Sequence, residues 1–170
     1  LGCYDLAIQD YADAIIIEPN NPFPYYNKGI AENKIGDYSS AFKSFSTAIK
    51  LDEGKEDFYH NRGFSLRKLG KYQEALKDFS TAISLNSQHF KAYFNRSTCW
   101  EKLGKLSEAI ADMKTCAALN TDKETSHFTL ANLQVRAGGK QLEEAAKIVI
   151  EYVLGSPLAF STRTLSTAII

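Results

Sequence analysis

Several features that identify large classes of protein are missing from this chain. The 170 residues carry 20 basic and 20 acidic side chains, and this zero formal net charge argues against binding of nucleic acid by bulk positive charge. The sequence has no long apolar run and no signal peptide, so we expect no membrane partner and no secretion. The 3 cysteines are an odd number without a pairing motif, which is typical of a reduced chain. These absences predict an intracellular, cytoplasmic protein.

Residue patterns for catalysis and for cofactors are missing too. The histidines (His60, His89 and His127) share no ligand spacing with each other or with a cysteine, so neither a zinc site nor a nucleophile–base pair is predicted. The glycines occur mostly singly and form no phosphate-binding loop. The adjacent carboxylates Glu143 and Glu144 fall on what should be a solvated helix face. We therefore predict no enzymatic activity, no cofactor and no metal.

What the chain does have is an internal repeat. Glycine recurs every 34 residues, at Gly2, Gly36, Gly70, Gly104 and Gly138. Other positions recur in phase with it, for example the small residues Ala7, Ala41, Ala75 and Ala109. Self-similarity at a fixed period of about 20–50 residues is the sequence signature of a solenoid.

Each repeat reads as a helical hairpin. Every glycine separates two amphipathic stretches, so it is expected to end the first helix in the left-handed conformation. The second stretch has apolar or small residues at spacings of 3, 4 and 7, as at Ala75, Leu76, Phe79 and Ala82, which gives one helical face. Small residues on the first stretch allow two antiparallel backbones to approach closely; these are Gly29, Gly63, Ser97 and Ala131.

The period and the positions in phase resemble the tetratricopeptide repeat family. The resemblance implies an all-α fold, a right-handed superhelical α-solenoid of antiparallel helix pairs. The expected units are a partial repeat 1–21, full repeats 22–55, 56–89 and 90–123, a degenerate repeat 124–159, and the start of a further helix or a tail over 160–170. The expected helices are 3–17, 22–35, 38–51, 56–69, 72–85, 90–103, 106–119, 124–137 and 141–154, with another beginning near 158. The chain opens at Leu1 on the last residue of an expected helix and closes on the apolar, uncapped residues 165–170, which favours a segment of a longer array.

The resemblance also implies a non-enzymatic protein–protein interaction module that binds a peptide or a partner segment in its concave groove. In this family the first helix of each repeat lines that groove. The corresponding positions give the candidate partner-binding residues Tyr26, Asn27, Ile30, Lys34, His60, Asn61, Phe64, Lys68, Lys91, Phe94, Asn95, Lys102 and Phe128.

The asparagine column Asn27, Asn61 and Asn95 is the most informative part of this set. A side-chain amide offers both a donor and an acceptor, so it can hold a peptide backbone. The O-linked N-acetylglucosamine transferases of the family carry a similar asparagine ladder. The alternative is that these amides only bridge neighbouring helices. The lysine column has its own alternative, because a cation in the last turn of a helix is favourable without any ligand, and the aromatic residues could simply pack.

Two other partner hypotheses follow from the resemblance. Chaperone-binding members of the family hold a C-terminal carboxylate with a five-residue clamp. The best register here supplies Asn61 and Lys91 but puts Tyr26, Ile30 and Asn95 at the other positions, which argues against a clamp. The alternative to a peptide-binding groove is a structural scaffold segment in a cytoskeletal or ciliary assembly, which uses its convex surface and its ends.

The repeat also predicts ion pairs inside the hairpins. Folding a repeat about its fifteenth residue brings the seventh position opposite the twenty-third. This predicts the pairs Arg62–Asp78 and Arg96–Asp112, because an arginine fork suits a carboxylate. In the first full repeat the two positions hold Lys28 and Ser44, so Lys28 is expected to be unpaired within its own repeat.

Overall fold

The computed structural model describes residues 2–120, 123–138 and 146–150, and its regular elements are α-helices. Residues 146–150 are helical. The labelled helices are α1 (Gly2–Ile17), α2 (Pro22–Ile35), α3 (Tyr38–Leu51), α4 (Glu56–Lys68), α5 (Tyr72–Leu85), α6 (Phe90–Lys102), α7 (Leu106–Leu119) and α8 (Lys123–Ala137).

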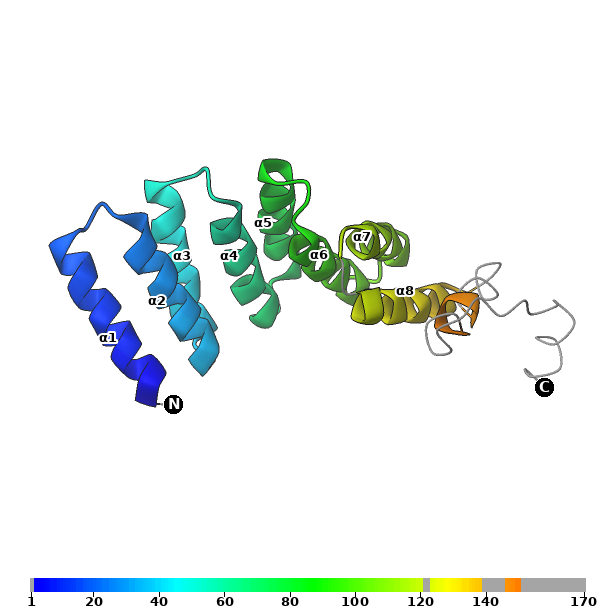
Figure 1. Cartoon of the computed structure of the whole chain (residues 1–170), viewed down its shortest axis with the longest axis horizontal. Coiled ribbons are helices and arrows are strands. Elements are labelled where there is room, and N and C mark those ends of the chain that lie inside the picture. Colours follow the sequence, from blue (N-terminus) through cyan, green and yellow to red (C-terminus); the bar gives the residue numbers. More distant parts are fainter. Residues whose placement is uncertain (1, 121–122, 139–145, 151–170) are drawn as a thin grey trace, which may run out of the picture.

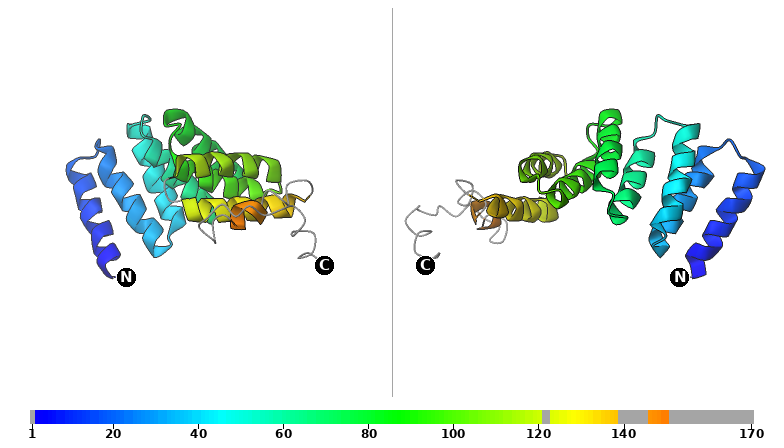
Figure 2. Two further views of the ribbon diagram at one scale, coloured as in Figure 1. Left: turned by 45° about the vertical axis from the view of Figure 1, so that its right-hand side comes forward. Right: turned by 180° about the vertical axis from the view of Figure 1, so that it is seen from behind.

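These helices form an open array rather than a globule. Each helix packs mainly against the helix before it and the helix after it in the chain. Figure 1 shows them in a row from α1 at one end to α8 at the other, and the row twists, so that α8 lies across the direction of α1. The two further views in Figure 2 show the same progressive rotation. The prediction of a superhelical α-solenoid built from antiparallel pairs is confirmed.

The helix boundaries agree with the sequence prediction to within one residue for α1 to α8. The reason is the glycine that ends each first helix: Gly36, Gly70 and Gly104 have φ values of 87°, 76° and 74°, a conformation that other residues rarely adopt. Of the predicted helix 141–154, residues 146–150 are helical. The rest of that segment and the helix expected from residue 158 lie outside the described residues.

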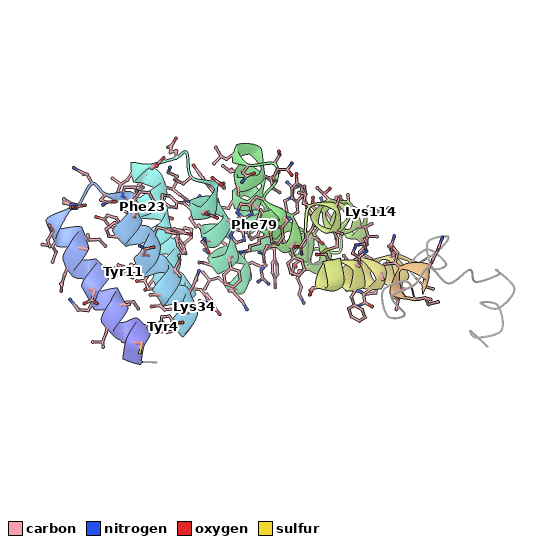
Figure 3. All side chains as sticks on the ribbon, viewed as in Figure 1. Tyr4, Tyr11, Phe23, Lys34, Phe79 and Lys114 are labelled. Carbon is pink, nitrogen blue, oxygen red and sulfur yellow. The ribbon has the colours of Figure 1, made fainter. Side chains whose placement is uncertain are left out.

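Close contact at the small residues of the first helices holds the hairpins together. A Cβ atom added to Gly29 would lie 2.7 Å from the ring of Phe45, and one added to Gly63 would lie 2.9 Å from the ring of Phe79. Both phenylalanines are completely buried, and Figure 3 labels Phe79 in the middle of the array. In these two repeats the backbone of the first helix therefore packs directly against a phenylalanine ring of the second helix.

The two predicted intra-repeat ion pairs are confirmed. Arg62 donates from Nε to Asp78 Oδ2 at 2.8 Å and from Nη2 to Asp78 Oδ1 at 2.7 Å. Arg96 makes the same two-pronged contact with Asp112, at 2.8 and 2.7 Å. Asp78 is only 5% exposed and Asp112 only 6%. In both pairs the hydrogen bonds to the carboxylate raise the pKa of the guanidinium, so it stays charged.

The expectation for Lys28 is wrong. Its Nζ lies 3.9 Å from Oε1 of Glu32, one helical turn away in the same repeat. Ser44, at the position that holds aspartate in the later repeats, donates from Oγ to Glu32 Oε2 at 2.7 Å. A carboxylate on the first helix thus replaces the missing carboxylate on the second, and residues four apart on a helix are natural neighbours.

The Gly63→Ala variant tests the backbone-to-ring contact. In an unobstructed helix this change stabilises by about 1 kcal/mol. Here the new methyl group meets the completely buried Phe79 ring, which has no room to withdraw, so we expect a loss of about 1–3 kcal/mol in the free energy of unfolding. Urea denaturation measures it. Ser97→Ala, at the same repeat position but with its Cβ already accommodated, is the control and should lose about 1 kcal/mol or less. A stabilised Gly63→Ala variant contradicts the packing.

A second prediction concerns the Arg62–Asp78 pair. Asp78→Leu leaves the Arg62 guanidinium, whose side chain is 22% exposed, without its carboxylate. We expect a loss of about 3 kcal/mol in the free energy of unfolding, because breaking a largely buried pair strands a charge. The double variant Arg62→Met/Asp78→Leu removes both charges and should recover most of that loss. Equal instability of the single and double variants in urea denaturation rules this explanation out.

Candidate functional site: a groove across the first helices

A hollow of about 450 Å³ runs across the first helices of the repeats, and we call it the central groove. It is built by α2, α4 and α6, with contributions from the start of α3, the end of α7 and the first turn of α8. Its lining residues are Ile30, Asn33, Lys34, Tyr38, His60, Asn61, Phe64, Lys68, Phe90, Lys91, Phe94, Asn95, Cys116, Asn120, Thr125 and Ser126. Figure 3 shows Lys34 at the C-terminal end of α2.

Nine of the sequence-predicted residues lie together in this lining: Ile30, Lys34, His60, Asn61, Phe64, Lys68, Lys91, Phe94 and Asn95. Four do not: Tyr26, Asn27, Lys102 and Phe128. Phe128 lines a separate hollow with Arg136 on α8.

Tyr26 has a packing role beneath the groove. Its ring centroid lies 4.8 Å from that of Phe58 and 5.8 Å from that of Phe45. Burial raises the pKa of the Tyr26 phenol to about 12. Its hydroxyl oxygen accepts a hydrogen bond of 3.1 Å from Nδ2 of Asn61, so Tyr26 positions a groove residue from behind.

Sequence reasoning missed seven lining residues. Asn33 occupies the twelfth repeat position, which lines the groove in this family, so it could have been predicted from the sequence. Tyr38 and Phe90 stand at the starts of helices, and the remaining four come from the end of α7 and the first turn of α8: Cys116, Asn120, Thr125 and Ser126. The register also assigns the second repeat position, that of Thr125, to the groove, whereas Tyr38, Cys116 and Asn120 lie outside the first helices and have no such signal.

The amides of Asn61 and Asn95 are held in the same way. Nδ2 of Asn61 donates to the Tyr26 hydroxyl and, at 2.8 Å, to the carbonyl oxygen of Asp57. Nδ2 of Asn95 is bonded to Nε2 of His60 at 3.1 Å and donates to the carbonyl oxygen of Lys91 at 3.0 Å. Because a carbonyl oxygen can only accept, these contacts fix which side of each amide is Nδ2. Both protons are used inside the protein, and each Oδ1 accepts no hydrogen bond from the described residues.

The lining is electropositive although the chain as a whole is neutral. It contains Lys34, Lys68 and Lys91 and no carboxylate. None of the three lysines forms an ion pair within the described residues. Nζ of Lys68 lies 5.5 Å from the ring centroid of Phe64 and 6.0 Å from that of Tyr38, so two aromatic faces hold this cation at the groove.

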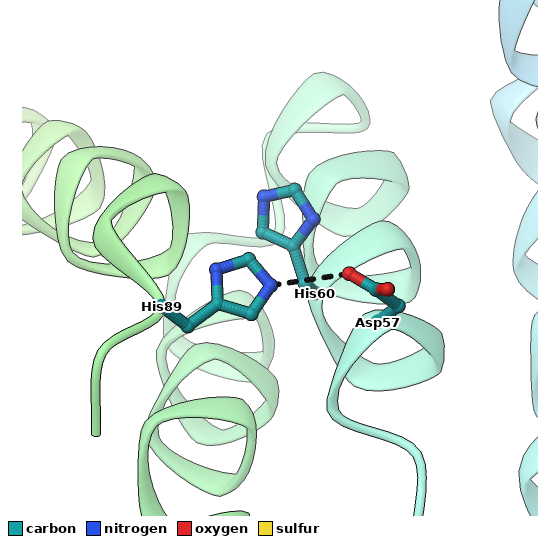
Figure 4. A group of neighbouring side chains, drawn as sticks. All are labelled: Asp57, His60 and His89. Atoms are coloured by element: carbon teal, nitrogen blue, oxygen red, sulfur yellow. Dashed lines mark hydrogen bonds and ion pairs between the residues drawn. The ribbon is translucent and has the colours of Figure 1, made fainter. Parts of the chain in front are cut away.

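Two histidines that the sequence analysis treated as unrelated lie side by side at one end of the groove. The ring centroids of His60 and His89 are 4.7 Å apart. Nε2 of His89 lies 3.3 Å from Oδ1 of Asp57, and one ligand atom from each of the three residues lies within 4.8 Å of the others (Figure 4). The prediction missed this cluster because His89 ends one repeat, at the N-cap of α6, where it faces the first helix of that repeat.

The hydrogen bonds assign this cluster a linking role. Nδ1 of His89 accepts from the backbone N–H of Ala92 at 3.2 Å as the N-cap of α6, so Nε2 carries the proton and donates to Asp57. A metal ion on Nε2 would displace that proton, and moving the proton to Nδ1 would break the cap. Nε2 of His60 accepts from Asn95, so this imidazole is neutral and protonated on Nδ1. The cluster joins α4 to the start of α6.

Comparison with known families fits this geometry. One family model of the tetratricopeptide repeat matches residues 56–89, and a second matches residues 24–55 and 90–123, which together cover more than half of the chain. The chain therefore belongs to the tetratricopeptide repeat family, a family of non-enzymatic interaction scaffolds. Membership identifies it as a protein–protein interaction module.

Solved structures show the same fold. MamA from Desulfovibrio magneticus RS-1 is 23% identical, with a TM-score of 0.82 over 90% of this chain and 85% of that one. The Arabidopsis OM64 TPR domain is 27% identical, with a TM-score of 0.65 over 67% of this chain and 94% of the domain. The first TPR domain of Spaghetti (RPAP3), bound to the HSP90 peptide SRMEEVD, is 25% identical, with a TM-score of 0.66 over 69% and 94%.

A search of the curated proteins finds no match. Among the described helices, none is long and apolar enough to cross a membrane.

The half-buried His60 makes the stability depend on pH. Burial, with smaller contributions from the charges of His89, Lys91 and Arg67, lowers the His60 pKa from 6.5 to about 3. Between these values the unfolded chain binds the proton and the folded chain does not. The contribution of His60 to the free energy of unfolding is therefore complete above pH 6.5 and falls toward pH 3, by up to about 1.4 kcal/mol per pH unit.

We expect the His60→Gln variant to show a smaller slope between pH 6.5 and 5, above the range in which most carboxylates titrate. The glutamine carbonyl oxygen still accepts from Asn95, so the link between α4 and α6 is kept. Urea denaturation at several pH values measures the slope. Identical slopes in the variant and the unchanged protein contradict a neutral His60 with a lowered pKa.

Proposed function

We propose that this protein binds an extended segment of a partner protein in the central groove, and that the segment has acidic character. The observation that carries the proposal is the groove lining itself, which holds three lysines without ion-pair partners, no carboxylate, and two ordered amides with free acceptor oxygens. Repeat proteins of this architecture use such extended surfaces for binding.

The asparagine amides suit the backbone of an extended peptide. Since Nδ2 of Asn61 and of Asn95 is used internally, each amide offers Oδ1, which accepts a hydrogen bond from a peptide N–H. The two amides are one repeat apart, which is roughly 10 Å for packed helices. An extended chain covers that distance in about three residues. Contacts to the backbone hold a segment in register without restricting its side chains.

Relatives of this fold support a peptide ligand. The Spaghetti domain is bound to a peptide with the sequence SRMEEVD, which contains three acidic residues. Our proposal does not involve the five-residue carboxylate clamp of the family, because Tyr26 occupies one clamp position and packs beneath the groove on Phe45 and Phe58. The partner segment is therefore recognised along its length rather than by a C-terminal carboxylate.

The double variant Asn61→Ala/Asn95→Ala tests the groove. Peptides selected from a phage-displayed random library against the unchanged protein supply the ligand, and fluorescence anisotropy measures affinity. We expect binding to weaken by about 10–100-fold, since each lost hydrogen bond is worth about 1 kcal/mol and tenfold is 1.4 kcal/mol. Circular dichroism should show an intact helical fold.

Lys77→Ala and Glu108→Ala, on exposed faces of the second helices α5 and α7, are the matched controls. Their affinities should stay within about twofold of the unchanged protein. The reverse result, with binding lost in these controls and kept in the asparagine variant, moves the site to the convex surface and favours the scaffold alternative.

A further inference from the structure

One cation beside the groove lacks the carboxylate that its counterparts have. The structure describes four arginines. Arg62 and Arg96 pair with buried aspartates, and Arg136 pairs with Glu101. Arg67 forms no ion pair and no hydrogen bond with any described residue. Its Nε is fully buried without a partner, whereas its Nη groups are not buried.

Arg67 lies next to the central groove, against the lining residue Phe64, without being one of the lining residues itself. It belongs to α4, the first helix of its repeat, at the twelfth position, where Asn33 of the preceding repeat lines the groove. Its guanidinium carbon lies 5.0 Å from the ring centroid of Phe64, a lining residue, and Nζ of Lys68 lies 5.5 Å from the same ring. Two unpaired cations therefore share one aromatic side chain of the groove.

A half-buried guanidinium without an acceptor is an unusual arrangement. The buried Nε loses its hydrogen bond to water and finds no acceptor among the described residues, although the guanidinium lies against the ring of Phe64. The planar fork of arginine matches the two oxygens of a carboxylate, and such charge-assisted pairs are stronger than neutral hydrogen bonds. The described lining holds no carboxylate that could pair with the accessible Nη groups, so these donors are available to the carboxylate of a ligand.

We infer that Arg67, together with Lys68, forms a subsite for the carboxylate of a glutamate or aspartate side chain in the partner segment, docked beside the ring of Phe64. This inference rests on the proposed function of the groove and adds a specificity determinant to it. The Nη groups bind the carboxylate oxygens, Lys68 adds a second positive charge, and Phe64 contacts the methylene groups of the acidic side chain.

The test is a parallel selection of phage-displayed random 12-residue peptides on the whole chain and on three variants, Arg67→Gln, Arg67→Lys and Lys77→Gln. For the unchanged protein we expect enrichment of one acidic position within an otherwise tolerant sequence. Arg67→Gln should abolish that enrichment, and Arg67→Lys should weaken it, because lysine keeps the charge without the fork. Lys77→Gln, with the same loss of charge on α5, should leave it unchanged.

A double-mutant cycle then measures the contact. The best selected peptide and its Glu→Gln form are titrated against the unchanged protein and against Arg67→Gln. We expect the peptide change to weaken binding about tenfold with Arg67 present and less than twofold in its absence. Thermal unfolding of Arg67→Gln distinguishes a structural role, since removing an unpaired cation should not lower the stability.

The outcomes separate the two claims. If no peptide is enriched, the proposed function fails, and the subsite fails with it. If peptides are enriched and depend on Asn61 and Asn95, but their acidic preference is absent or survives in Arg67→Gln, only the subsite is overturned.

Discussion

The close approach of a first-helix backbone to a buried ring on the second helix sets the geometry of the whole array. Gly29 against Phe45 and Gly63 against Phe79 leave no space for a Cβ atom. In the third repeat the first-helix residue is Ser97 and the ring is replaced by Met113, so a larger residue meets a thinner, more adaptable one. This repeated fit sets the shape of each hairpin. The first helices α2, α4 and α6 contact one another when the hairpins stack, and the groove is the surface that they share.

The arginines of the arginine–aspartate pairs also connect each repeat to the preceding one. Arg62 also donates to Ser46 Oγ at 3.4 Å, and Arg96 donates to Ser80 Oγ at 3.1 Å, so each guanidinium touches the second helices of two successive repeats. A lysine has no fork to divide between two partners. The Lys28 site accordingly uses a local contact with Glu32 instead. Fixed relative placement of the repeats is what gives a groove built from three of them a defined shape.

Contacts inside a repeat were predictable, and contacts between repeats largely were not. The recurring glycines predicted where the helices end. Counting residues from the turn of the hairpin predicted that Arg62 lies opposite Asp78. Two contacts that shape the groove join residues 35 apart, Asn61 with Tyr26 and Asn95 with His60, and the contact of Arg136 with Glu101 at the separate hollow on α8 has the same spacing. That spacing is one repeat plus one residue. This spacing depends on how the first helices of successive repeats stack, and the 34-residue period of the sequence does not predict that stacking. The contact between His60 and His89 was missed for a related reason, because it joins a first helix to the N-cap of the next.

The electropositive groove belongs to a chain whose formal net charge is zero. The buried carboxylates are paired internally: Asp78 and Asp112 with arginines, and Glu32 with Lys28 and Ser44. These charges cancel within the fold, so the neutral total says little about the surface. Lys34, Lys68 and Lys91 remain uncompensated in one hollow. Exposed lysines at a rim act over about 10 Å at 0.1 M salt and mainly speed association. The half-buried guanidinium of Arg67, in contrast, binds a carboxylate only by direct contact. In the binding mode that we propose, different side chains in and beside the groove therefore attract an acidic segment and select its carboxylate.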